Sequence, residues 1–300
     1  MTGMSTTIGQ SKKKKRGLTV YSVREHGGNI LFMLPAFTLF AFVELIPFIQ
    51  SIPISFTDKK AIFAKAWNFV GIDNYIKLIN NNTFQQTFLN TAHFTILYIL
   101  GANILGLALA LMIWRSGKLN NVIRTLLFMP FTVSLVASTK VWSYVYTDVL
   151  MPITGQPSPL GVSSQVIAGL SAIAIWRDMG YCMLIYIAGL QSIPLEYYEA
   201  ANVEGANWWT QFRKITLPML MPAITSNVTL ILAWGLRCFD YSQMVITMKA
   251  AKTTAVFVYE YIFGNSRAGI GQAAAIILTL VLVLLTNVIT TVLRKKEVEL

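Results

Sequence analysis

The 300-residue chain is 55% hydrophobic and only 12% charged, with a mean hydropathy of +0.57. Soluble domains carry about 25% charged residues, so this composition excludes a water-soluble enzyme, a disulfide scaffold and a disordered chain. A formal charge of +11 would suggest nucleic-acid binding in a soluble protein, but in a membrane protein the basic residues must first be assigned to loops. Both cysteines lie in apolar segments, so we expect no disulfide framework and no metal site.

Apolar segments recur along the whole chain and predict an all-α membrane protein with six transmembrane helices. Each segment exceeds the roughly 20 residues that a helix needs to cross about 30 Å of hydrocarbon. Helix is expected because lipid cannot satisfy exposed backbone N–H and C=O groups. The first segment is too long for the apolar region of a signal peptide, so we expect it to be retained. The six segments are 28–56, 92–114, 124–146, 166–190, 218–239 and 269–293.

The basic residues predict the orientation of these helices. Six spans place the N-terminal tail, the second and fourth loops and the C-terminal tail on one face, which holds 14 of the 24 Lys and Arg residues. Seven lie on the other face and three lie inside spans. The positive-inside rule then places both termini in the cytoplasm. We expect a basic tail over 1–27 that anchors the topology or contacts lipid rather than nucleic acid, a membrane domain over 28–293 and a C-terminal tail over 294–300.

The loop over about 191–218, between the fourth and fifth spans, has the pattern of two short helices. Pro194 begins the first helix, and Glu196 and Glu199 favour its N-terminus. Gly205 permits a turn because glycine adopts left-handed dihedrals without steric cost. A second, amphipathic helix follows, with aromatic and aliphatic residues spaced one to four apart. These residues are Trp208, Trp209, Phe212 and Ile215.

This loop resembles the "EAA" loop of ABC-importer permease subunits. The ordered residues that carry the resemblance are Glu199, Ala200, Ala201, Gly205, Ile215, Leu217 and Pro218. The lead-in Gly-Leu-Gln-Ser-Ile-Pro over 189–194 is similar to the sugar importers of the maltose, raffinose and glycerol-phosphate type, as is Phe-Val-Gly-Ile-Asp-Asn-Tyr over 69–75. One departure is the Met-Lys-Ala-Ala that follows Thr247, where the family carries Gly-Gly-Pro.

The resemblance implies a type I ABC-importer permease fold, with a cytoplasmic coupling helix that docks in a groove of the ATP-binding subunit. It further implies a second homologous permease subunit, an ATP-binding subunit dimer, an extracytoplasmic solute-binding protein, a carbohydrate substrate and the plasma membrane of a prokaryote. The resemblance assigns the seven residues above to coupling with the ATPase: Glu199 could pair with a basic residue in the partner's groove, and Gly205 enables the turn. The permease would form half of the translocation path.

Residues for catalysis are missing from the sequence. No G-x-x-x-x-G-K-[ST] motif is present, so a partner subunit must hydrolyse ATP. The only two histidines, His26 and His93, are far apart and on opposite predicted faces. We therefore expect no enzymatic activity and no cofactor in this chain.

Ionisable and aromatic residues inside the spans are candidates for the substrate path. Ionisable residues in a membrane usually face a cavity or another helix. Arg177 and Asp178 are adjacent and point in different directions, whereas Arg237 and Asp240 are three apart and could pair on one helix face. Structural ion pairs are an equal alternative, and aromatic residues near span ends are often interfacial belts. The candidates are Trp142, Tyr146, Arg177, Tyr181, Asn227, Arg237, Asp240 and Tyr241.

Three alternatives to a sugar permease remain at this point. The same architecture could import a glycerol-phosphodiester or another non-sugar solute. A self-sufficient secondary transporter predicts inverted repeats and broken helices at matching positions in both halves, and the sequence shows no such pattern. A membrane enzyme lacks candidate catalytic groups.

Overall fold

The computed structural model describes residues 32–245 and 248–297, so the predicted tail 1–27 and residues 298–300 lie outside the described residues. The chain divides into two units, 1–51 and 52–300, which are described separately. The described part of the first unit, 32–51, is a helix that continues to Ser55 and contains one π-helical turn, η1 (Ala41–Leu45), before α2 (Ile46–Ser55). Its apolar side chains are nearly all exposed, as a lipid-facing helix requires.

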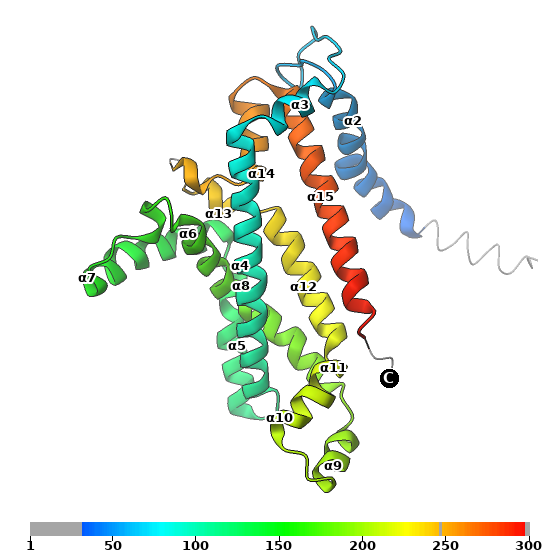
Figure 1. The fold of residues 1–300 in the computed structure, drawn as a ribbon, viewed down its shortest axis with the longest axis vertical. Coiled ribbons are helices and arrows are strands. Elements are labelled where there is room, and N and C mark those ends of the chain that lie inside the picture. Colours follow the sequence, from blue (N-terminus) through cyan, green and yellow to red (C-terminus); the bar gives the residue numbers. More distant parts are fainter. Residues whose placement is uncertain (1–31, 246–247, 298–300) are drawn as a thin grey trace, which may run out of the picture. The chain divides into compact units, whose positions relative to one another are not determined.

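The second unit is built around long helices that lie side by side (Figure 1). α4 and α8 pack against each other along most of their lengths, and α12 lies against both. Small side chains such as Ala102, Ala174 and Cys182 are fully buried and let these backbones approach closely. The long helices are α4 (Asn82–Ile113), α8 (Val166–Gln191), α12 (Met221–Leu236) and α15 (Ala268–Arg294).

Helical membrane architecture is confirmed: the described residues contain no strand, only an isolated bridge between Thr57 and Phe69. In the described ranges, four helices are long and apolar enough to cross a membrane, and the number is six if each of two bent helix pairs is one span. The shorter elements outside these pairs are α3 (Asp73–Ile79), η3 (Pro159–Gly161), α9 (Leu195–Val203), η5 (Lys249–Ala251), α14 (Thr254–Tyr259) and η6 (Glu260–Gly264).

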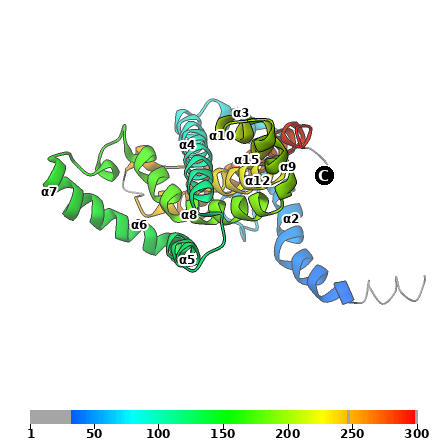
Figure 2. The same cartoon turned by 90° about the horizontal axis from the view of Figure 1, so that it is seen from below.

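The third predicted span is not one continuous helix, so the prediction of a single helix over 124–146 is wrong. α5 (Lys118–Thr132) ends after Pro130, and the next helical stretch, Leu135–Thr154, leaves at an angle of 100°. Val133 and Ser134 are extended, and the Ser134 hydroxyl accepts a hydrogen bond from the Ala137 amide (3.2 Å), which starts a new helix. This stretch, which comprises α6 (Leu135–Tyr144), η2 (Val145–Leu150) and α7 (Met151–Thr154), runs away from α4 and α8 in both ribbon views (Figures 1 and 2).

The fifth predicted span is bent as well. The helical stretch Trp208–Met219 meets Met221–Gln243 at an angle of 63°, so Pro218 lies before the bend and does not open the span. The bends in the third and fifth spans do not occupy matching positions in the two halves of the chain. The first stretch comprises α10 (Trp208–Gln211), η4 (Phe212–Thr216) and α11 (Leu217–Met219), and the second comprises α12 and α13 (Asp240–Gln243).

Hydrogen bonds between loops show which connections share an end of the second unit. The Gln191 side-chain amide donates to the Trp114 carbonyl (3.2 Å), so the connections after α4 and after α8 lie together. At the other end, the Asn90 amide donates to the carbonyls of Ala250 and Lys252 (both 2.9 Å). This grouping agrees with the predicted sharing of faces by the second and fourth loops.

Candidate functional site

A cavity of 420 Å³ opens among the bundle helices, next to the break between α5 and α6. Its wall combines aromatic rings with two arginines and two aspartates, a composition far more polar than the surrounding apolar helices. The residues that line it are Phe94, Tyr98, Phe131, Leu135, Arg177, Asp178, Trp234, Arg237, Cys238, Phe239, Asp240 and Tyr241.

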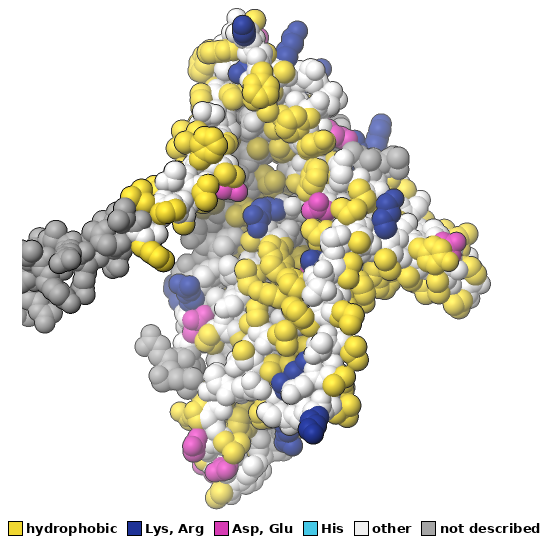
Figure 3. Space-filling view, turned by 180° about the vertical axis from the view of Figure 1, so that it is seen from behind, with side chains coloured by type: hydrophobic (Ala, Val, Ile, Leu, Met, Phe, Trp, Pro, Cys, Tyr) yellow, Lys and Arg dark blue, Asp and Glu magenta, His cyan; other side chains and the backbone are white. Residues whose placement is uncertain are grey.

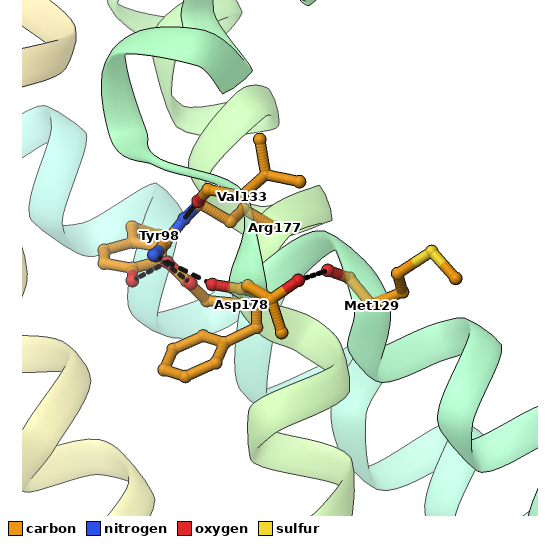
Figure 4. Close-up of polar contacts among 7 residues, drawn as sticks. Tyr98, Met129, Val133, Arg177 and Asp178 are labelled. Atoms are coloured by element: carbon orange, nitrogen blue, oxygen red, sulfur yellow. Dashed lines mark hydrogen bonds and ion pairs between the residues drawn. The ribbon is translucent and has the colours of Figure 1, made fainter.

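The Arg177 guanidinium holds the broken end of α5. Its Nε donates to the Val133 carbonyl (3.0 Å) and its Nη2 to the Phe131 carbonyl (3.1 Å) (Figure 4). The last carbonyls of a helix have no partner within the helix, and an extended Val133 cannot continue the ladder. The guanidinium also lies over the Phe131 ring, 5.0 Å from its centroid. Arg177 therefore replaces the backbone hydrogen bonds that the break removes.

Asp178 neutralises this guanidinium from the same helix. Its carboxylate lies 2.5 Å from Arg177 Nη1, and it also accepts a hydrogen bond from the Tyr98 hydroxyl of α4 (Figure 4). The Asp178 side chain is 1% exposed and that of Arg177 is 15% exposed. Buried charges are tolerated when they are paired and hydrogen-bonded. The set therefore links α4, α5 and α8.

Arg237 and Asp240 line the same cavity but do not form the ion pair that their spacing in the sequence allowed. Arg237 donates only to the Ala233 carbonyl (3.2 Å), through Nε, and the Asp240 carboxylate receives no hydrogen bond from the residues that the structure describes. The physical reason is that α12 ends at Leu236, so the helical spacing that would align positions three apart is lost. Neither charged group therefore has an ion-pair partner within the part of the chain that the structure describes.

Three aromatic rings from three helices stack beside the cavity. Phe131 of α5 stacks on Tyr181 of α8 with ring centroids 4.8 Å apart, and Trp234 of α12 lies 5.4 Å from Tyr181. Sugars bind through aromatic faces combined with hydrogen bonds, and such a stack offers a rigid apolar face. Tyr181, a predicted path residue, lies behind Phe131 and Trp234 and not in the cavity wall.

The remaining predicted path residues are divided. Tyr241 lines the cavity and is buried. Trp142 and Tyr146 pack against each other (5.3 Å) beyond the break, where Trp142 also meets Trp176 (5.6 Å). Asn227 is fully buried and donates to the Cys182 carbonyl (3.1 Å). The structure therefore places Trp142, Tyr146 and Asn227 outside the cavity wall.

Several cavity residues carry no signal that the sequence analysis used. Tyr98 offers one, because a hydroxyl in the middle of an apolar span needs a buried partner. The others are ordinary apolar residues whose position depends on packing. The cavity residues that were not predicted are Phe94, Tyr98, Phe131, Leu135, Trp234, Cys238 and Phe239.

The predicted coupling loop forms a hairpin of α9 and α10 at one end of the second unit (Figure 1). Glu199 and Ala200 on α9 are exposed. Gly205 has φ +73° with open space where a Cβ would lie, so its glycine serves the turn and no close packing. The two arms are joined by the Gln211 side-chain amide, which donates to Asn202 Oδ1 (2.6 Å).

Three of the other coupling-loop candidates, Ile215, Leu217 and Pro218, lie at the foot of the hairpin and are half-buried. Ile215 packs against the main hydrophobic core of the second unit. Ala201 is also half-buried, but it lies on α9 beside the turn, where its carbonyl accepts a hydrogen bond from the Ala206 amide (2.9 Å). The seven predicted residues thus divide into a group on α9 and at the turn, and a group that joins the hairpin to the bundle.

Comparison with known proteins places the chain in a family. The family model described as "Binding-protein-dependent transport system inner membrane component" matches residues 102–298. The chain belongs to this family and is a membrane-spanning permease subunit of an ABC importer, which confirms the resemblance of the EAA loop.

Curated relatives and a solved structure support the assignment. The "probable starch degradation products transport system permease protein AmyD" of Thermoanaerobacterium thermosulfurigenes is 29% identical over 90% of this chain and 95% of its own. The "trehalose/maltose transport system permease protein MalF" of Thermococcus litoralis is 29% identical over 87% of this chain and 91% of its own. A chain of a bacterial alginate ABC transporter in complex with an alginate pentasaccharide-bound periplasmic protein has the same fold, with a TM-score of 0.77 and 20% identity over 91% of this chain and 96% of that chain.

Proposed function

We propose that this permease forms half of the translocation path for an oligosaccharide or related carbohydrate, in the plasma membrane of a prokaryote and with both termini in the cytoplasm. Its partners would be a second homologous permease, an ATP-binding subunit dimer that hydrolyses the ATP, and an extracytoplasmic solute-binding protein. Relatives with sugar transport in their names support the solute class.

The observation that carries the proposal is a cavity with an aromatic wall, in which Arg237 and Asp240 have no ion-pair partner among the residues that the structure describes. Arg237 would donate hydrogen bonds to sugar hydroxyls, and Asp240 would accept them. The Trp234 and Phe131 rings, with centroids 6.2 Å apart, would cover an apolar face of a sugar ring. Pockets for small molecules combine apolar walls with a few polar groups in this way.

Coupling to the ATPase would pass through α9. Its exposed carboxylates, Glu196 and Glu199, suit a groove with basic residues. α8 leads into α9 through Ser192, Ile193 and Pro194, and the second arm leads back into α12. Movement of the docked hairpin would therefore displace α8, which carries Arg177 and Asp178, and α12, which ends just before Arg237.

The test is uptake and ATP hydrolysis by the complete complex in vesicles, with the binding protein and a panel of neutral oligosaccharides. We expect hydrolysis to rise when binding protein and a transported sugar are added together. Gly205→Asp should leave the complex assembled in the membrane but separate hydrolysis from uptake. Gly155→Asp is the matched control, because Gly155 has a similar positive φ (+68°) and open space but lies after α7.

Two results would contradict the proposal. Normal sugar uptake by Gly205→Asp would show that the hairpin does not couple ATP hydrolysis to transport. Solute flux through this chain alone, without an ATPase, would indicate a self-sufficient transporter. A cysteine at the exposed position Ala200 can report the contact directly by cross-linking, because the natural Cys182 and Cys238 are buried.

A further inference from the structure

The two arms of the hairpin carry opposite charges. The first arm, α9 with its C-cap, contains Glu196, Glu199 and Glu204 and no basic residue. The second arm, the helical stretch Trp208–Met219, contains Arg213 and Lys214 and no acidic residue. In the view from behind, acidic side chains lie at the lower tip of the molecule, and basic side chains lie higher and to the right at the same end (Figure 3). One arm therefore suits a cationic surface and the other an anionic one.

The second arm also presents a preformed aromatic surface. The rings of Trp208 and Phe212 are nearly parallel, with centroids 5.5 Å apart and planes 10° apart. Trp209 stacks on Phe212 from 5.7 Å. Trp208 is 65% exposed and Trp209 is 60% exposed, so the described part of the chain leaves them largely uncovered. Two indoles fixed by stacking need little further ordering when they meet a partner surface.

The direction of this arm differs from that of the helical stretch that follows it. It is bent by 63° from the stretch that begins with α12, so when α12 crosses the bilayer the arm lies closer to the membrane plane than to the normal. It is located between α9 and the foot of α12 (Figure 1). A helix with aromatic and aliphatic residues on one face and basic residues beside them is typical of interfacial helices.

Another tryptophan and a neighbouring arginine lie at the same end of the bundle. Trp114 follows the end of α4, and the Arg115 guanidinium lies 5.8 Å from the centroid of its ring. Gln191, which precedes the hairpin, donates to the Trp114 carbonyl. Tryptophan is enriched at the level of lipid headgroups, and Lys and Arg are attracted to anionic lipids there.

We propose that the second arm of the hairpin, through Trp208, Trp209, Phe212, Arg213 and Lys214, binds the headgroup region of an anionic phospholipid bilayer. The arm continues directly into a membrane-spanning helix, so its aromatic surface adjoins a surface that lipid already covers. The acidic first arm is the one left for the ATPase. The inference depends on membership of the permease family and not on the solute.

A consequence of this anchoring follows from the bonds between the arms. Besides the bond between Gln211 and Asn202, Gln211 donates to the Ala206 carbonyl (2.9 Å), and the hydroxyls of Tyr198 and Thr216 are 3.0 Å apart. The first arm therefore cannot move independently of the lipid-bound second arm. When the ATPase moves α9, the second arm therefore moves with it over the lipid surface.

The experiment measures tryptophan quenching in the complete complex, reconstituted in vesicles of phosphatidylcholine and phosphatidylglycerol with brominated acyl chains. Subtracting the emission of Trp208→Phe/Trp209→Phe from that of the natural protein gives the emission of these two indoles alone. Phenylalanine at both positions preserves the aromatic stacking on Phe212. We expect this difference to be strongly quenched by the brominated lipid. Arg213→Gln/Lys214→Gln should reduce the quenching severalfold, and so should replacement of phosphatidylglycerol by phosphatidylcholine.

The matched control is Lys118→Gln, an exposed basic residue at the same end that begins α5, which should leave the quenching unchanged. If brominated lipid does not quench this difference in emission, but removal of the ATPase shifts it, the proposal is overturned and the second arm docks on the ATPase. Difference emission that responds to neither would place the arm in water and overturn it as well. Gel filtration of each variant confirms assembly before the measurement.

Discussion

Two arginine–aspartate sets line the same cavity and differ in how their charges are used. In the first set, Arg177 bonds two carbonyls at the end of α5 and the Asp178 carboxylate, which in turn accepts a hydrogen bond from Tyr98. In the second, Arg237 has one bond to a carbonyl of its own helix, and Asp240 has no side-chain partner among the described residues. The difference teaches that a charged residue in a span is not sufficient evidence for a transport site, because its hydrogen-bond partners decide its role.

The largest effect is expected at Arg177, because the first set is structural. Arg177→Met would leave a buried carboxylate unpaired and two carbonyls unpartnered, which should lower the free energy of unfolding by about 3–5 kcal/mol. The measurement is thermal unfolding of the purified complex. Arg177→Met/Asp178→Leu should recover part of the loss because it removes the isolated charge. If Arg177→Met were as stable as the natural protein but took up no solute, Arg177 would instead be a solute-binding residue.

The first set can also be disturbed without changing a charge. A Cβ at Gly180 would lie 2.1 Å from the Leu127 carbonyl oxygen, so α5 and α8 would have to separate. Gly180→Ala should lower the free energy of unfolding by about 1–3 kcal/mol, the usual cost of overpacking, and weaken the bond from Arg177 to Phe131. Gly161→Ala is the control, because open space surrounds that position. Equal stability of the two variants would contradict the close approach.

The second set should affect transport but not stability. Asp240→Asn and Arg237→Gln remove one charge each and leave no described ion pair broken, so stability should change by no more than about 0.5 kcal/mol. Uptake should fall about tenfold, which corresponds to about 1.4 kcal/mol of solute interaction. Initial rates over a range of sugar concentrations separate affinity from turnover. Arg267→Gln, an exposed basic residue outside the cavity, should transport normally.

The smallest effect is expected at a carboxylate outside the membrane. The Asn68 backbone amide (2.5 Å) and its side-chain amide (2.9 Å) hold the pKa of Asp58 below its ordinary value. A carboxylate with a lowered pKa in the folded state stabilises the fold above its ordinary pKa and loses that contribution as the pH falls through the folded value. The protection factors of residues 57–69, which compare their hydrogen exchange with that of the unfolded chain at the same pH, should therefore fall slightly in acid. Asp58→Asn should abolish this pH dependence, and a persisting dependence would assign it to another group.

The spans and the hairpin could be predicted because their signals are local. Apolar length identifies a membrane helix, and the ordered EAA residues with Gly205 identify the turn, which has the expected positive φ. The break between α5 and α6 could not be predicted in the same way. Pro130 is tolerated in membrane helices when neighbouring groups satisfy the freed backbone, and here the neighbour is Arg177, which lies 47 positions away in the sequence.

The break also explains which path residues the sequence misplaced. Trp142 and Tyr146 follow the bend of 100°, so their helix no longer points along the bundle. Their rings pack against each other, and Trp142 also packs against Trp176. Phe131 comes before the bend and reaches the cavity, although nothing in its sequence context distinguishes it. Carbonyl groups such as that of Val133 carry no sequence signal at all, and they are the partners that decide the role of Arg177.

The close approach of α8 to α5 has a mechanical consequence. α8 has 26 residues and is therefore about 39 Å long. Gly180 lets α8 contact the α5 backbone. Arg177, one turn earlier in α8, donates a hydrogen bond to the Phe131 carbonyl at the end of α5. If α8 moves as a rigid body, a displacement of the end that leads into α9 also displaces the part of α8 that lines the cavity, and the Phe131 ring moves with it. The coupling hairpin and this part of the cavity wall would then move as a single rigid unit.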